Sequence, residues 1–528
     1  MKGERLFRIL GLIDEDLIEE VPTGFSATLP RRPPWKRYLA VAACVTLVCG
    51  FSFAWLVTGG FHGMGSAAPG EDSGSSNGGG SGIATDNEPL SVEGTTFMSY
   101  AGPVFPLTLA EAAEGLTAER KTTWDFAPGT YQDGSLRQWG AGVTDSYAIV
   151  NITEFDQTVT ALYPFTGSFT ELASQQPTVT VDGEEAEGVL YAGAYAGGFR
   201  DAGVDDGSTW NLQYPDSWTD YKALLEDGGY LAQALGDGTV QDLPVTVYEF
   251  TDFAAPADYD AATQAIEFTI DREQTTVLTY GFNGSSWDEE TGWRQYSYFV
   301  PNGVRRDQAP KLLIVLGADI GDYTLEGYEN GGCEKKLPGV SCTVTRRETT
   351  LDEVLDRLCG DYLETCADWQ WGMTEDETAA VPFALFRRAV SELLVQYGPI
   401  SETIKDRYAD GRLDDIISEA MSMDRVLYLA VPVTVPAGRR VNVTFELWKE
   451  PSFDFGCSGA ENAGLQGYDL VTALGSCLDF TAQTAALVNT EGVDIVRQNF
   501  GFDPENGITE VTLDMEAEHY YLEVRPLD

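Results

Sequence analysis

Two kinds of hydrophobic pattern divide the chain. One apolar stretch runs without a charged residue from Tyr38 to Gly60, whereas the rest of the chain shows short alternating segments. A helix of ~20 apolar residues crosses a ~30 Å hydrocarbon core, and cytoplasmic flanks carry an excess of Lys and Arg. Four basic residues lie just before this stretch, and the next one after it is Arg120. We therefore expect one transmembrane helix over residues 38–60, with the N-terminus in the cytoplasm and the bulk of the chain extracellular.

Three other structures could account for this stretch: a buried core helix, a signal peptide and a lipoprotein signal. A buried core helix would not explain the basic flank or the Gly/Ser tract that follows. A signal peptide cleaved near Ser66-Ala67-Ala68 would have an unusually long N-terminal region. A lipoprotein signal at Val41-Ala42-Ala43-Cys44 would leave only three apolar residues after Arg37. The membrane span is therefore the favoured interpretation.

The segments that flank the span differ in pattern. Residues 1–37 form the predicted cytoplasmic tail, in which apolar residues recur at helical spacing over residues 1–20. Residues 1–29 are thus a candidate docking segment for a cytoplasmic protein. Residues 61–95 are rich in Gly and Ser, which is typical of a flexible linker. The linker would hold the outer part clear of the membrane.

Beyond the linker, period-two alternation predicts a mainly β fold with a helical segment. Residues 147–154 and 158–165 alternate and are joined by a short turn, which predicts a hairpin, and Asp182-Gly183 indicates a second hairpin turn. Strands at this spacing favour immunoglobulin-like (Ig-like) β-sandwich domains. The expected units are a β-sandwich-like domain over 96–215, a helix insert and second β region over 216–346, a helical segment over 347–424 and a C-terminal β-sandwich-like domain over 425–528.

Charge limits the possible partners of the outer part. The 528 residues carry a net charge of −50, and residues 1–60 are close to neutral, so the acidity lies outside. A surface of this sign repels the phosphate backbone, and we exclude nucleic acid as a partner. Acidity would also suit calcium, but no EF-hand loop motif is present.

Cysteine usage predicts disulfides in the outer part. Two of the eight cysteines lie in the span and six lie beyond it. An even number in an extracellular domain is typical of disulfide bonds. Sequence neighbours are the expected partners, which gives the pairs Cys333–Cys342, Cys359–Cys366 and Cys457–Cys477. The second pair requires Gly360 to break a helix, because seven residues of continuous helix separate two Cα atoms by ~10 Å.

Histidine is scarce, which argues against several enzyme classes. The chain has two, His62 in the linker and His519 in a predicted strand. Catalytic triads, Cys-His nucleophiles and His-ligated metals all need a histidine in a cleft. The P-loop and the dinucleotide-binding fingerprint are also absent. We therefore expect no catalytic residue, no cofactor and no metal, and we do not expect an enzyme.

Two stretches place tryptophans beside acidic residues. Trp287 and Trp293 flank one acidic loop, and Trp369 and Trp371 form a second group. Rings that stack on sugars would use such loops, so these four residues are candidate ligand contacts. Packing at domain junctions is the commoner use of such residues. A glycosidase needs a pair of carboxylates, but an acid-rich sequence cannot single one out.

One short motif in the tail carries a family resemblance. Ile13-Asp14-Glu15-Asp16-Leu17-Ile18-Glu19-Glu20 precedes a basic stretch and the single span. This arrangement resembles the start of uncharacterised single-span membrane proteins of clostridial Firmicutes, some of which carry a provisional anti-sigma-factor label. The chain lacks the His/Cys zinc motif of zinc-binding anti-sigma factors, since no His or Cys occurs before Cys44. The resemblance implies a membrane topology and suggests a regulatory role for the tail.

Three functions follow from these observations. The first is a membrane-anchored, non-catalytic outer module that binds or senses a surface protein or glycan. The second is an anti-sigma-like regulator that acts through residues 1–29. The third is a surface glycosidase that uses two carboxylates.

Overall fold

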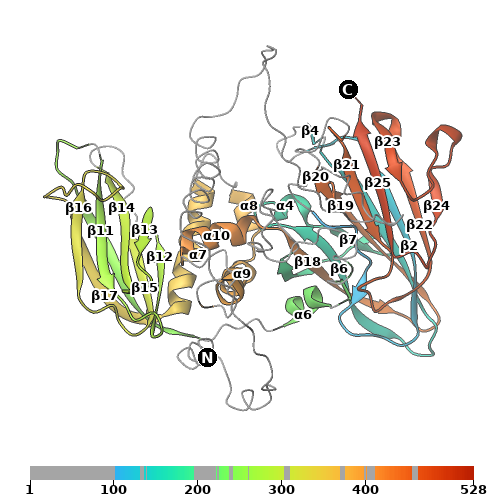
Figure 1. Cartoon of the computed structure of the whole chain (residues 1–528). Coiled ribbons are helices and arrows are strands. Elements are labelled where there is room, and N and C mark those ends of the chain that lie inside the picture. Colours follow the sequence, from blue (N-terminus) through green and yellow to red (C-terminus); the bar gives the residue numbers. More distant parts are fainter. Residues whose placement is uncertain are drawn as a thin grey trace, which may run out of the picture. The chain divides into compact units, whose positions relative to one another are not determined.

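The computed structural model describes residues 101–527 except 131–135, 138, 196–221, 223–224, 227, 237–241, 260, 302–309, 369–374, 398–399, 401–410 and 455–461. The predicted tail, span and linker therefore lie outside the described residues. Within the described residues, no helix is long and apolar enough to cross a membrane. This part of the chain is mainly β, as predicted, with several antiparallel sheets (Figure 1).

A seven-stranded sheet, here called the β5 sheet, is the largest layer. Its strand order is β24-β22-β2-β5-β19-β7-β8, and only β2 and β22 run parallel to each other. The two sandwich-like units expected over 96–215 and 425–528 share this sheet, because each contributes strands to it. The strands are β2 (Leu116–Asp125), β5 (Ala141–Asn151), β7 (Thr178–Val181), β8 (Glu184–Glu185), β19 (Arg440–Lys449), β22 (Asp479–Val488) and β24 (Glu510–Thr512).

Two four-stranded sheets cover different ends of one face of the β5 sheet. The β6 sheet has the order β1-β6-β18-β9, and its Tyr163 stacks on Phe445 of β19 with ring centroids 4.1 Å apart. The β21 sheet has the order β20-β21-β25-β23 and packs Leu522 in one core with Trp124 of β2. The strands are β1 (Thr108–Leu109), β6 (Gln157–Gly167), β9 (Val189–Tyr195), β18 (Arg425–Val435), β20 (Phe453–Asp454), β21 (Gln466–Val471), β23 (Val493–Gln498) and β25 (His519–Pro526).

The predicted hairpin between residues 147–154 and 158–165 is wrong, although both strands form. β5 pairs with β2 and β19, whereas β6 pairs with β1 and β18, so the chain crosses between two sheets here. β18 and β19 are joined by a crossing of the same kind. The buried amide Nδ2 of Asn151 donates to the carbonyls of Phe155 and Val435, each at 2.9 Å. This side chain holds the first crossing against the end of β18.

The turn at Asp182-Gly183 forms as predicted, with both residues at positive φ (49° and 85°). It joins β7 to the two-residue β8, however, and β9 continues into the β6 sheet.

A second sandwich forms from residues 244–350. The β10 sheet has the order β12-β15-β10-β17 and the β11 sheet has the order β13-β14-β11-β16. Aromatic side chains from both sheets fill the core between them, for example Phe250 and Tyr298. The strands are β10 (Pro244–Ala254), β11 (Ala261–Thr269), β12 (Thr275–Tyr280), β13 (Gly284–Trp287), β14 (Trp293–Pro301), β15 (Lys311–Gly317), β16 (Tyr323–Tyr328) and β17 (Ser341–Thr350).

The helices complete the cores. Thr350 Oγ1 accepts a hydrogen bond from the Glu353 amide at 3.4 Å, at the start of α7. Apolar faces of α7, α9 and α10 share one core with Val245 and Ile314 of the β10 sheet, while α6 packs on the outer face of the β6 sheet. The helices are α4 (Leu172–Gln175), α6 (Gly229–Leu235), α7 (Leu351–Asp368), α8 (Glu375–Ala379), α9 (Phe383–Tyr397) and α10 (Leu413–Ser422).

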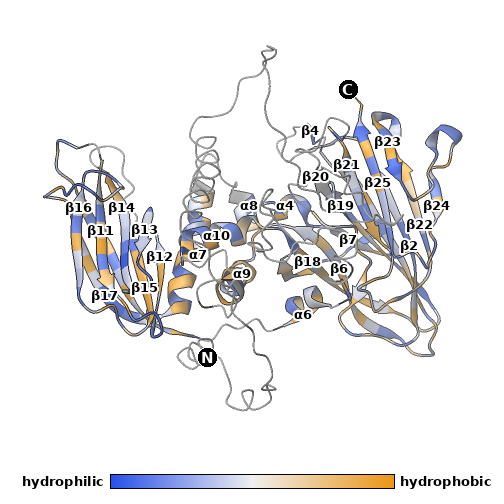
Figure 2. Cartoon of the chain, viewed as in Figure 1, coloured by the Kyte–Doolittle hydropathy of each residue, from blue (hydrophilic) through white to orange (hydrophobic). Residues whose placement is uncertain are grey.

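The alternation that predicted the strands is visible along the ribbon. Figure 2 shows hydrophobic and hydrophilic residues following one another along strands such as β11 and β25. β6 departs from this pattern, because its residues 161–165 are all buried. The β6 sheet is covered on both faces, by the β5 sheet and by α6, so this strand has no polar side.

Candidate functional site

An open depression lies on the face of the β11 sheet that points away from the β10 sheet. Ile266 and Phe268 pack into the core between these sheets, so the alternate residues Glu267 and Thr269 point the other way. Thr324 of β16 lies opposite Glu267, and Trp293 of β14 lies opposite Thr269. The depression measures about 340 Å³ and is lined by Glu267, Thr269, Trp293, Asp322 and Thr324, with the buried Phe268 and Ile320.

Glu267 is the most firmly held of the polar residues in the depression. Its Oε1 accepts hydrogen bonds from Gln295 Nε2 at 2.8 Å and from Tyr328 Oη at 2.9 Å. Burial and the Glu267 carboxylate together raise the pKa of Tyr328, so this phenol stays a donor. The carboxylate is therefore oriented before any ligand arrives.

The β16–β17 loop (residues 329–340) covers the rest of this face. Leu337 donates its amide to the Gly327 carbonyl at 2.7 Å, and Lys336 pairs with Glu326 at 2.9 Å. Beneath the loop, Ala265 and Ser297 are buried. The depression is thus the uncovered part of the outer face, beside the edge of this loop.

The two tryptophans of the predicted aromatic-acidic loop lie on opposite faces of the β11 sheet. Trp287 of β13 is paired with Arg294, and paired residues share a face, so Trp293 points the opposite way. Trp293 lines the depression, whereas Trp287 is exposed elsewhere. Between them, the Asp288 carboxylate accepts from the amides of Glu290 and Thr291, each at 2.9 Å, and these bonds lower its pKa. The loop acid therefore holds the turn.

The second aromatic group, Trp369 and Trp371, lies outside the described residues.

The structure corrects two of the expected disulfides. Cys333 contacts Ser297 on the outer face of the β11 sheet, whereas Cys342 contacts Tyr298 in the core on the other side. Ser297 and Tyr298 are consecutive on β14, so the sheet separates the two thiols. Both thiols are free, and the predicted Cys333–Cys342 bond is absent.

The predicted Cys359–Cys366 bond is also absent. α7 continues through Gly360 without a break, so the two Cα atoms lie two turns apart, ~10 Å, on one helix. Gly360 is tolerated there because the cost of a helical glycine is only ~1 kcal/mol, which the packing of α7 outweighs. Cys477 is a free thiol near Thr108, and its predicted partner Cys457 lies outside the described residues.

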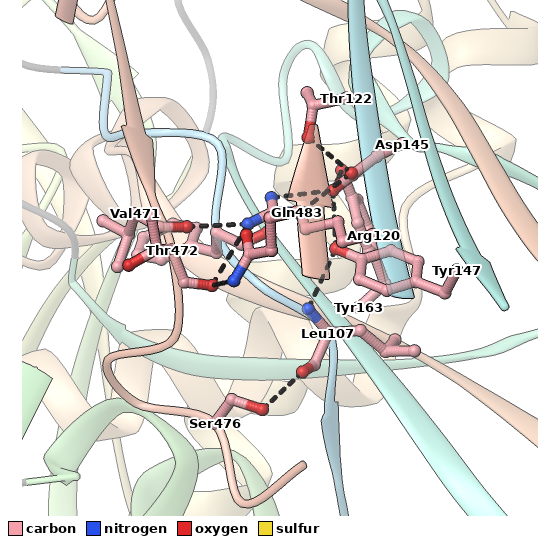
Figure 3. A network of polar contacts seen from close by, with 11 residues as sticks. Leu107, Arg120, Thr122, Asp145, Tyr147, Tyr163, Val471, Thr472, Ser476 and Gln483 are labelled. Carbon is pink, nitrogen blue, oxygen red and sulfur yellow. Dashed lines mark hydrogen bonds and ion pairs between the residues drawn. The ribbon is translucent and has the colours of Figure 1, made fainter. Parts of the chain in front are cut away.

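A buried ion pair is the centre of the polar network in Figure 3. Arg120 of β2 donates through Nε and Nη2 to the two carboxylate oxygens of Asp145 on β5, each at 2.9 Å. Both side chains are fully buried. Asp145 also accepts from Tyr147 Oη at 2.6 Å and Thr122 Oγ1 at 2.9 Å.

The remaining bonds of Arg120 join separate layers. Its Nη1 donates to the Val471 carbonyl at the end of β21 (2.7 Å), and its Nη2 donates to the Phe105 carbonyl (2.8 Å). Burial alone would lower the pKa of Arg120, but Asp145, with Tyr147 and Tyr163, outweighs burial and raises it. Because the network is closed to solvent, it acts as a structural seam at the junction of the three sheets.

His519 is buried in β25, with Nε2 3.2 Å from Asp469 Oδ1 on β21. Each side chain is only 1% exposed, so a substrate has no path to this imidazole. A general base must reach the proton that it removes, and His519 cannot.

The depression has the composition of a recognition site. Across the described ranges, no group of three or more His, Cys, Asp or Glu side chains is placed to hold a metal ion. An indole ring, two carboxylates and two hydroxyls instead face solvent together.

Sequence analysis identified only Trp293 of these lining residues. Glu267, Asp322 and Thr324 were missed because they come from different strands, and each is one acid or hydroxyl among many. Only the antiparallel register of β16, β11 and β14 brings them together. No sequence signal distinguishes them from other surface residues.

Comparisons with known proteins do not assign the chain to a family. No family model matches the sequence, and a search of the curated proteins finds no relative.

Proposed function

We propose that this chain is a membrane-anchored extracytoplasmic protein whose outer part is a non-catalytic module that binds a surface glycan. The depression on the β11 sheet is the proposed binding site. The observation that carries the proposal is the position of the Trp293 indole beside Glu267, Thr269 and Thr324 on a rigid sheet. The membrane anchor and an anti-sigma-like role of residues 1–29 rest on the sequence alone.

The chemistry of the lining supports a sugar ligand. An aromatic ring offers an apolar face against which the C–H groups of a sugar ring can pack, while carboxylates and hydroxyls bond its hydroxyl groups. Ligand pockets usually measure ~300–1,000 Å³, so a depression of about 340 Å³ suits one small unit of a longer ligand. Because the depression is open to solvent, the rest of a long glycan could extend beyond it.

Oligosaccharide titration of the full-length protein tests the proposal. Binding of N-acetylglucosamine and glucosamine tetramers would be followed through tryptophan fluorescence and calorimetry. We expect Trp293→Ala to abolish binding, because it removes the stacking surface. Trp287→Ala is the matched control, since this tryptophan is 55% exposed on the opposite face of the same sheet. Equal loss in both variants, or loss in neither, would count against this site.

A second candidate function is glycan hydrolysis by the two acids of the depression, Glu267 and Asp322. Asp322 directly precedes β16, whose Thr324 pairs with Glu267, and the two carboxylates line the same depression. Inverting glycosidases hold their carboxylates ~6.5–9.5 Å apart. Release of reducing ends from these tetramers, lost in Glu267→Gln, would favour the hydrolase. Binding without turnover favours the non-catalytic module.

A further inference from the structure

The depression carries negative charge without a basic partner in its lining. Of its lining residues, Glu267 and Asp322 are acids, and none is Lys, Arg or His. Glu267 accepts its two hydrogen bonds from Gln295 and Tyr328, which are neutral donors, so neither bond neutralises the charge of the carboxylate. A ligand that bears a positive charge would supply what the site lacks.

The aromatic ring points to the same chemistry. Trp293 of β14 lies opposite Thr269, and Glu267 lies two residues along β11 on the same face. Asp322 directly precedes β16, the strand on the other side of β11, and lines the same depression. A cation within ~6 Å of an indole centroid is attracted by the ring, and a nearby carboxylate adds a charge-assisted hydrogen bond. Ring and carboxylates together form a three-sided site for an ammonium group.

The basic residues near this end of the sandwich are engaged elsewhere. Arg272 pairs with Glu289 at 3.7 Å, and Lys336 pairs with Glu326 at 2.9 Å. Arg294 lies on the opposite face of the sheet from Trp293. The field in the depression therefore keeps the sign of its two acids, in a chain with a net charge of −50.

We propose that the depression recognises an amino sugar with a free, protonated amine. This inference rests on the proposed function, and it names the substrate class of that site. The ammonium lies between Glu267, Asp322 and the Trp293 ring, while Thr269 and Thr324 bond the sugar hydroxyls. An N-acetylated sugar loses the charge, and an acidic sugar is repelled.

Titration of the full-length protein at pH 6 and low salt tests this inference with three probes. At this pH an amine with an ordinary pKa near 8 is charged and carboxylates are ionised. We expect the glucosamine tetramer to bind at least ~10-fold more tightly than the N-acetylglucosamine tetramer, and this preference to shrink in 1 M NaCl. A trilysine peptide is the third probe, and it presents ammonium groups without a sugar ring.

Two variants give the matched comparison. Asp322→Asn should weaken glucosamine binding by ~10-fold and N-acetylglucosamine binding far less, because an amide can still hydrogen-bond a sugar hydroxyl but cannot pair with an ammonium group. Glu290→Gln removes one charge from the exposed β13–β14 turn and should change neither. A matching loss in Glu290→Gln would show that only the overall field matters and would overturn the specific site.

Each outcome separates the inference from the proposed function. Equal binding of both tetramers overturns the amino-sugar inference and leaves glycan binding intact. Tight binding of trilysine at the level of the glucosamine tetramer overturns the sugar assignment in favour of a basic protein segment. Binding of no oligosaccharide defeats the proposed function itself.

Discussion

At the scale of the residue, buried charged side chains are the positions where a substitution should destabilise the fold most. Arg120 and Asp145 are fully buried and satisfy each other, together with backbone carbonyls from two further layers. Removal of one partner from such a pair leaves an uncompensated charge in a low-dielectric core. The neighbouring residue Lys121 points to the opposite face of β2 and forms an exposed pair with Glu510.

We expect Asp145→Ala to destabilise the protein by ~3–5 kcal/mol, because it strands the Arg120 guanidinium in the core. Chemical denaturation followed by circular dichroism measures the change. Lys121→Ala breaks the exposed pair one residue away and should cost less than ~1 kcal/mol. Similar losses in the two variants would contradict the role assigned to the buried pair.

A second residue-scale prediction concerns pH. Burial lowers the pKa of Lys449 to about 8, against the opposing effect of Glu450, Asp424 and Asp469. Burial, with Glu171 and Glu450 adding to it and Lys449 opposing it, raises the pKa of Asp424 to about 7. The Lys449 ammonium donates to the carbonyls of Ala101 (3.0 Å) and Glu450 (2.8 Å).

The two shifts act in separate pH windows. Folded Asp424 binds more protons than the unfolded residue between pH ~4 and 7, so its contribution to stability falls as pH rises through that window. Folded Lys449 binds fewer protons than the unfolded residue between pH ~8 and 10.4, so its contribution rises there. In the unchanged protein, Lys449 should raise the melting temperature as pH increases from ~8 to 10.4. We expect this rise to be missing in Lys449→Met. Asp424→Asn should lose the acidic fall and keep the alkaline rise; parallel pH profiles in all three proteins would refute this.

At the scale of the element, turns rather than strands determine the local connections. Strands formed where alternation predicted them, but β5 and β6 joined different sheets because of the crossing held by Asn151. The β13–β14 turn is a second case, and it places Trp293 in the depression. Gly292 in this turn has φ of +74°, and a Cβ there would lie 2.1 Å from the Ile270 carbonyl oxygen.

Gly292→Ala should therefore destabilise the protein by more than ~1–2 kcal/mol, the cost of a left-handed backbone alone, because the clash adds to it. It should also weaken any ligand binding that depends on Trp293. Thermal unfolding measures the first effect. Gly492→Ala is the control, since no atom lies within 4 Å of a Cβ at that position and its φ is ordinary. A neutral Gly292→Ala variant would mean that the turn can rearrange.

At the scale of the whole molecule, residues from both ends of the described chain build the same sheets. β18 lies between β6 and β9, and β19 lies between β5 and β7. The core that these strands share is continuous with the apolar faces of α7 and α9. The sandwich of residues 244–350 has a core of its own, between the β10 and β11 sheets.

A chain that ends at residue 424 should therefore lose the fold of residues 108–195, because the central partners of β5 and β6 are gone. Limited proteolysis followed by mass spectrometry should show rapid cleavage within 141–167. The sandwich of residues 244–350 should resist longer, since each of its strands keeps its partners. A protease-resistant 101–195 segment in the truncated chain would show that the first half folds alone.

The sequence by itself determined the class of fold and most of its elements. Alternation located strands within residues 147–154 and 158–165, because periodicity is a property of neighbouring residues. It also identified Trp293 as a surface aromatic. Pairing partners, by contrast, depend on loop closure and on burial on both faces, which no local window contains. Tertiary structure alone decided that β5 and β6 lie in different sheets, that a sheet separates Cys333 from Cys342, and that Glu267 and Asp322 meet beside one ring. Contacts between distant segments depend on how whole sheets pack together, which no short stretch of sequence contains. The depression therefore forms only when β14, β11 and β16 pair in register.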